Sequence, residues 1–116
     1  MKDYRYIEKP WGHEEIWAEE DIYVGKFLYI KDGHSLSRQY HNYKRETITV
    51  LNGSLLVEIG FPVTESFQLV NGKTFTIIPG CIHRFIAAYG NVRVIEVSTN
   101  HLDDVVRLED NYSRSS

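Results

Sequence analysis

Several features that mark other protein classes are scarce in this chain. Its 116 residues include one cysteine, Cys81, which excludes a framework of intramolecular disulfides and favours a reducing compartment. No apolar run approaches the roughly 18 residues of a membrane span, and the N-terminus lacks the apolar segment of a signal peptide. The net charge is −3, and no basic cluster stands out. We therefore expect a cytoplasmic protein that binds neither membranes nor nucleic acid.

A convincing amphipathic helix is also missing from most of the chain. Short segments rich in β-branched and aromatic residues alternate instead with turns that contain glycine. The Asn52-Gly53 and Asn71-Gly72 pairs are typical of tight hairpins, so each should join two strands that pair with each other. Strands are expected over 13–18, 22–31, 36–43, 45–51, 54–59, 66–69, 73–78, 83–88 and 92–98. This pattern predicts an all-β barrel or sandwich.

The length and composition fit a single domain that spans residues 1–116. A chain of this size with 42% hydrophobic residues can bury a core without disulfides or other staples. Residues 1–12 are interpreted as an extended N-terminal arm, which Trp11 anchors onto the barrel. Residues 102–116 are interpreted as a C-terminal tail, with a short helical turn between residues 102 and 110.

Candidate metal ligands lie in two separate stretches of the chain. Gln39 and His41 are two residues apart, which places both side chains on one face of a strand. Glu46 follows His41 after four residues, enough for the chain to turn back, and His83 ends a second segment that begins at Gly72. Two imidazoles, a carboxylate and an amide oxygen would supply four ligands to a divalent Zn, Mn, Fe, Co or Ni ion. Other coordination positions would stay open for water or substrate. Alternatively, these residues are polar barrel positions and a hydrogen-bonded interior histidine.

The same residues follow the two sequence motifs of the cupin superfamily, which this chain resembles. The first motif has the spacing Gly-x5-His-x-His-x(3,4)-Glu-x6-Gly, and the second has Gly-x5-Pro-x-Gly-x2-His-x3-Asn. The chain matches them at Gly33, His41, Glu46, Gly53, Gly72, Gly80 and His83, with Gln39 in place of the first histidine. Residues 9–12, 36–41 and 103–114 further resemble the C-terminal cupin domain of type II mannose-6-phosphate isomerases. In many members that domain is fused to a guanylyltransferase, and here it would stand alone.

The resemblance implies a single-domain cupin, a double-stranded β-helix or jelly-roll barrel, that contains one divalent metal ion. It also implies a sugar-phosphate isomerase that converts mannose 6-phosphate to fructose 6-phosphate through an enediolate. Arg107 is the candidate residue to bind the phosphate group of the substrate. Alternatively, it forms a salt bridge with a neighbouring aspartate in the tail. Lys26 and Lys44 are further catalytic candidates, and solvated lysines are the alternative. A homodimer is expected, paired through the arm with Trp11 and an exposed edge strand.

Two other functions remain open at this point. Small isolated cupins can bind a sugar or another metabolite without turnover, as a sensing or accessory module. Iron-loaded cupins can be dioxygenases, although Gln39 disfavours this because many oxygenases hold iron with several imidazoles.

Overall fold

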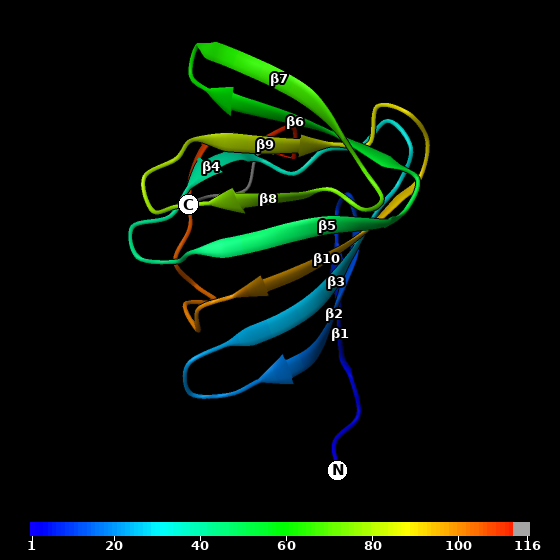
Figure 1. The fold of residues 1–116 in the computed structure, drawn as a ribbon, viewed down its shortest axis with the longest axis vertical. Coiled ribbons are helices and arrows are strands. Elements are labelled where there is room, and N and C mark those ends of the chain that lie inside the picture. The colour runs from blue at the N-terminus through cyan, green and yellow to red at the C-terminus, as the bar shows by residue number, and fades with distance from the viewer. Residues whose placement is uncertain (113–116) are drawn as a thin grey trace.

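The computed structural model describes residues 1–112, and its strands pair into two antiparallel sheets (Figure 1). The last four residues of the expected tail lie outside this described part. The strands are β1 (Arg5–Lys9), β2 (Gly12–Glu19), β3 (Val24–Ile30), β4 (Arg38–Tyr40), β5 (Glu46–Asn52), β6 (Ser54–Gly60), β7 (Val63–Val70), β8 (Thr74–Ile77), β9 (His83–Ile86), β10 (Val92–Ser98) and β11 (Val106–Glu109). Within residues 1–112, no helix is long and apolar enough to cross a membrane.

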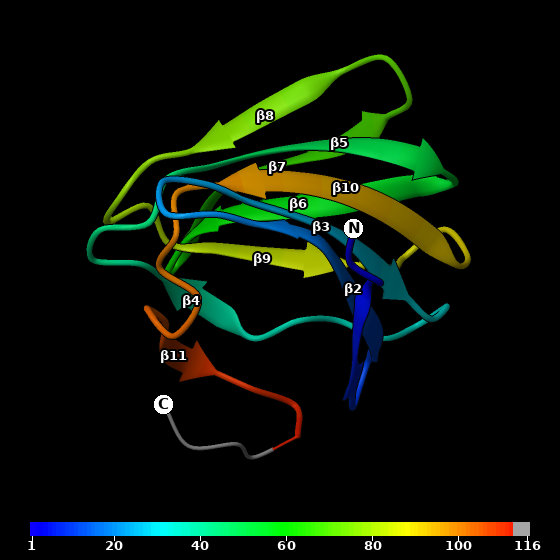
Figure 2. The same ribbon diagram turned by 90° about the horizontal axis from the view of Figure 1, so that it is seen from below.

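The two sheets face each other and enclose the core. One sheet has six strands in the order β1-β2-β3-β10-β5-β8, and the other has five in the order β11-β4-β9-β6-β7. Figure 2 shows the sheets edge-on, with β11 and β4 on one side of the barrel and β1 and β2 on the other. This is the double-stranded β-helix of the cupin fold, so the predicted fold class is confirmed.

The interior of the barrel is apolar toward one end and charged toward the other. On β3, β10 and β5 the side chains that point inward are aliphatic, until each strand reaches one buried charged residue. Those residues are Lys26, Glu96 and Glu46, and Lys26 lies directly opposite Glu96 in the strand register. In the other sheet, β9 changes in the same way from Phe85 to His83. The alternation of each strand thus places several charged groups in one layer of the interior.

The two Asn-Gly turns connect strands that do not pair with each other, so the predicted hairpins are wrong. Asn52-Gly53 leads from β5 in the six-stranded sheet to β6 in the five-stranded sheet, and Asn71-Gly72 leads back from β7 to β8. Gly53 has φ of 80°, and a Cβ there would lie 2.5 Å from the carbonyl oxygen of Asn91. Only glycine fits this crossing between the sheets without strain or displacement of its neighbour.

The N-terminal arm is extended as predicted, but residues 5–9 form the edge strand β1 by pairing with β2. Trp11 follows this strand and is only 2% exposed, packed in the hydrophobic core. A buried Trp11 anchors the arm but cannot form part of a surface that pairs with a second copy. The homodimer, paired through the arm and an exposed edge strand, stays a prediction.

The tail contains a strand where a helical turn was predicted. β11 pairs with β4, with Arg107 opposite Gln39. Two buried arginines hold it there, because Arg38 and Arg84 contact the carboxylate of Glu109 at 3.2 and 2.8 Å. Arg84 therefore has a structural role in holding the tail. These sheet contacts decide the conformation of the tail, and local propensity does not.

Candidate metal centre

A cavity of about 400 Å³ opens at the charged end of the barrel. Side chains from both sheets line it, including all three residues Gln39, His41 and Glu46 from the first motif. Small-molecule sites commonly have volumes of about 300–1,000 Å³, so this cavity suits a compact metabolite. Its walls are mainly polar, which favours a charged or hydroxylated ligand.

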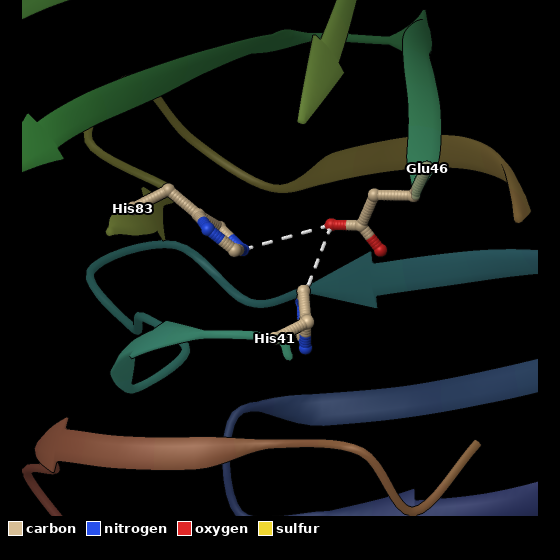
Figure 3. A group of neighbouring side chains, drawn as sticks. All are labelled: His41, Glu46 and His83. Carbon is tan, nitrogen blue, oxygen red and sulfur yellow. Dashed lines mark ion pairs between the residues drawn. The ribbon is translucent and has the colours of Figure 1, made fainter. Parts of the chain in front are cut away.

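Three of the four predicted metal ligands converge beside this cavity. His41, Glu46 and His83 are all buried, and their ligand atoms lie within 4.8 Å of one another. Figure 3 shows both imidazoles directed at the same carboxylate oxygen. Oε1 of Glu46 lies 3.8 Å from Nε2 of His41 and 3.6 Å from Nε2 of His83. Residues from β5, from β9 and from the loop after β4 are thus brought to one point.

Backbone carbonyls orient both imidazole rings. Nδ1 of His41 donates a hydrogen bond to the carbonyl oxygen of Asp104 at 2.6 Å, and Nδ1 of His83 donates to that of Cys81 at 3.0 Å. A carbonyl oxygen only accepts, so each Nδ1 carries the proton and each neutral ring presents a lone pair on Nε2. Burial lowers the pKa of His83, which favours this neutral form.

This arrangement fits a divalent metal ion. Both Nε2 atoms are buried, and neither has a hydrogen-bond partner among residues 1–112. Their distances from the carboxylate oxygen exceed a hydrogen bond, whereas two donors bound to one ion at about 2.0–2.2 Å lie roughly 3–4 Å apart. Hydrogen bonds that fix the other nitrogen of a ligating histidine are typical of metal sites.

Lys44 holds the carboxylate of Glu46 from the side away from the histidines. Its ammonium lies 2.9 Å from Oε2 of Glu46 and 3.1 Å from Oε2 of Glu96, and all three side chains are buried. Burial lowers the pKa of Lys44, but the two carboxylates raise it by more, so its pKa lies above the ordinary value. Burial raises the pKa of Glu46, but Lys44 and the two histidines lower it by more. Lys44 is therefore charged, and so is the carboxylate of Glu46.

The other predicted site residues line the same cavity. Gln39 lies on β4, and its side-chain oxygen accepts a hydrogen bond from the hydroxyl of Ser37 at 2.8 Å. That oxygen has a second lone pair, so Gln39 as fourth ligand stays a prediction. Lys26 is buried and lies 3.4 Å from both carboxylate oxygens of Glu14, in contrast to a solvated lysine. Arg107 also faces the cavity.

Three further site residues were not predicted. Glu14 and Glu96 are inward-facing residues of β2 and β10. Glu96 continues the alternation of Val92 and Val94, so its inward direction could have been predicted from the sequence. Burial and the neighbouring Glu46 raise the pKa of Glu96. Asp104 comes from the tail and had no local signal.

Asp104 organises the loop that follows His41. Its carboxylate accepts hydrogen bonds from the backbone amides of residues 42, 43 and 44 at 3.0, 2.7 and 2.9 Å. Burial alone would raise the pKa of this carboxyl, but the three amides lower it to about 2. Because the carbonyl of the same residue orients the His41 ring, the tail positions a candidate metal ligand.

The fold and the site together define a cupin with a candidate metal centre. Comparison with known proteins identifies the family, because the sequence profile described as "Mannose-6-phosphate isomerase C-terminal" matches residues 1–110. The chain belongs to this family. The predicted resemblance is therefore confirmed.

Two curated relatives illustrate the relationship. The chain is 32% identical over 120 residues to mannose-1-phosphate guanylyltransferase ManC of Salmonella typhimurium, covering 96% of this chain and 23% of the relative. It is 30% identical over 118 residues to xanthan biosynthesis protein XanB of Xanthomonas campestris, covering 97% and 24%. The chain thus spans about a quarter of the length of these relatives.

Solved structures support the fold independently. An uncharacterized conserved protein with a double-stranded beta-helix domain from Klebsiella pneumoniae matches with a TM-score of 0.71 and 16% identity. The match covers 84% of each chain, so the likeness extends over most of the barrel.

Proposed function

We propose that this protein is a metal-dependent isomerase that interconverts mannose 6-phosphate and fructose 6-phosphate. The convergence of His41, Glu46 and His83 beside a polar cavity is the observation that carries the proposal. Membership of the family described as "Mannose-6-phosphate isomerase C-terminal" supports an isomerisation of this sugar phosphate. The name of the relative ManC also refers to a mannose phosphate. A divalent ion held by these three residues, with Gln39 as a fourth donor, would stabilise negative charge on the sugar oxygens.

The cations around the cavity divide into two roles. Lys44 has a raised pKa and stays protonated, so it cannot accept a proton from the sugar near neutral pH. Its role in this proposal is to keep Glu46 ionised and in place. Arg107 on β11 faces the same cavity from the five-stranded sheet. A guanidinium there suits the phosphate of the substrate, because it can donate two parallel hydrogen bonds to phosphate oxygens.

The test is a coupled assay with metal-free protein reloaded separately with Zn, Mn, Fe, Co or Ni. We expect the formation of fructose 6-phosphate from mannose 6-phosphate to depend on the metal. His41→Ala should lose both the bound metal, measured by elemental analysis, and the activity. His13→Ala is the matched control, because His13 stacks on tyrosines away from the cavity.

The outcome separates the proposal from the other functions considered. Absence of turnover by every metal-loaded sample across several hexose phosphates would refute the isomerase. Stabilisation by a sugar phosphate without turnover would indicate a binding module, and metal-dependent consumption of oxygen would indicate a dioxygenase.

A further inference from the structure

An aldose–ketose isomerase needs a base that moves a proton between neighbouring carbons of the sugar. If the chain is the isomerase proposed above, on which this inference rests, that base must face the cavity. Imidazoles are unsuitable here, because His41 and His83 present their free nitrogens to the candidate metal position. Lys44 stays protonated, and Lys26 is paired with the carboxylates of Glu14 and Glu96, so the carboxylates that line the cavity are the remaining candidates.

Most of these carboxylates are already engaged. Glu46 belongs to the candidate metal centre, and Glu96 is almost enclosed, with a side chain only 4% exposed and ion pairs to both Lys44 and Lys26. The carboxylate of Asp104 binds the backbone amides of the loop after His41. Nearer the surface, Glu19 pairs with Arg5, and Asp103 is exposed. Glu14 is left as the carboxylate inside the cavity that is not bound to the backbone, enclosed, or required by the metal.

The position of Glu14 suits a base. It lies on β2, and Lys26 approaches both of its carboxylate oxygens at 3.4 Å, which orients the group. The Glu14 side chain is 12% exposed and lines the cavity, so a ligand in the cavity can reach it. A chain of ion pairs through Lys26, Glu96 and Lys44 connects Glu14 to Glu46, so both lie in the same polar layer.

We infer that Glu14 is the general base of the isomerisation. Its carboxylate removes the hydrogen of C2 of the open-chain aldose as a proton. The electron pair of that bond forms the C1=C2 double bond of an enediolate, and the negative charge moves to O1. The Glu14 carboxyl then returns the proton to C1, while the hydroxyl proton of O2 moves to O1 and the C2=O2 carbonyl forms. No proton is gained or lost overall.

The experiment compares Glu14→Gln with Glu15→Gln in the metal-loaded enzyme. Glu15 is the neighbouring residue on β2 and contacts His13 and Arg93, outside the cavity, so it is a matched control. Glu14→Gln should lower kcat about a hundred- to ten-thousand-fold, whereas Glu15→Gln should stay within about threefold. Metal content and the calorimetric Kd for fructose 6-phosphate should stay unchanged in Glu14→Gln.

Two further readouts distinguish a base from a structural residue. Transfer of solvent deuterium to C1 of fructose 6-phosphate should fall together with kcat. The pH profile of kcat should change in Glu14→Gln, whereas Glu15→Gln should keep the profile of the wild type.

Each possible result decides the matter. A kcat of Glu14→Gln within about tenfold of wild type would overturn the inference, as would loss of metal or of ligand binding by this variant. If Glu14→Gln does not fold, Glu14→Asp is the test of the inference. Aspartate keeps the negative charge near Lys26, but its shorter side chain moves the carboxylate away from a ligand in the cavity. An unchanged kcat in Glu14→Asp would overturn the inference, and at least a tenfold loss at the same Tm would support it. Inactivity of the wild-type protein would refute the proposed function and, with it, the assignment of Glu14 as the base.

Discussion

Lys44→Met should strongly destabilise the metal-free protein. The ammonium of Lys44 neutralises two buried carboxylates at 2.9 and 3.1 Å, and its removal leaves both without their closest cation. Loss of one partner from a buried ion pair typically costs about 3–5 kcal/mol. At about 4 °C per kcal/mol for a domain of this size, Tm should fall by ~12–20 °C.

The pH of the measurement follows from the pKa of Lys44. That pKa is raised above 10.5 by the two carboxylates, so the stabilisation is fully present below pH 10.5. It is lost only as the pH rises through the pKa of the folded state. The free energy of unfolding should therefore be measured by urea titration at pH 7, where the whole contribution is present.

A double-mutant cycle with Glu96 separates this electrostatic effect from packing. The double variant Lys44→Met, Glu96→Gln should recover about 1–3 kcal/mol relative to Lys44→Met, because one uncompensated carboxylate is removed with its cation. Lys31→Met, at an exposed lysine, should change the stability by less than about 0.5 kcal/mol. A Lys44→Met protein within about 1 kcal/mol of wild type, or a double variant without recovery, would refute the reasoning.

Two further predictions concern the tail and a turn between the sheets. Asp104→Asn should destabilise by about 1–2 kcal/mol at pH 7, discounted because the carboxylate is partly exposed. The pKa of Asp104 in the wild type is lowered from 3.8 to about 2. Urea titrations should therefore show the difference in free energy of unfolding between wild type and variant shrinking as the pH falls from about 4 toward 2. A difference that stays constant over this range would contradict the assignment. Gly53→Ala should lower Tm more than Gly72→Ala. Both glycines have positive φ, but only a Cβ at Gly53 meets a neighbour, the carbonyl oxygen of Asn91 at 2.5 Å. Equal losses in Tm would show that this close contact is unimportant.

Local patterns predicted the strands well. The expected strand over 92–98 has the observed bounds. The expected strand over 54–59 ends one residue early, and the one over 45–51 is displaced by one residue at each end. Each of these strands has one face in the core, so the alternation of apolar and polar residues is strong. His41, Glu46 and His83 were selected as candidate ligands because their residue types and spacing match a family motif, and their side chains converge.

Connections and electrostatic partners were harder to predict. An Asn-Gly pair favours a tight turn, but it does not determine whether the next strand returns beside the first or crosses to the opposite sheet. The turns at Gly53 and Gly72 therefore looked like hairpins and are crossings. Asp104 was missed for a related reason, since its partners are 60 to 63 residues away in the sequence.

The amino-acid sequence alone predicted an all-β chain with two histidines and a carboxylate as candidate ligands, because strand periodicity and motif spacing are local properties. Tertiary structure decided which carboxylates face the cavity, which lysines are paired, and how the tail orients His41. These features depend on contacts between strands that are distant in sequence. Only the packing of the two sheets determines whether a buried charge meets an opposite charge, a metal-binding group or a substrate.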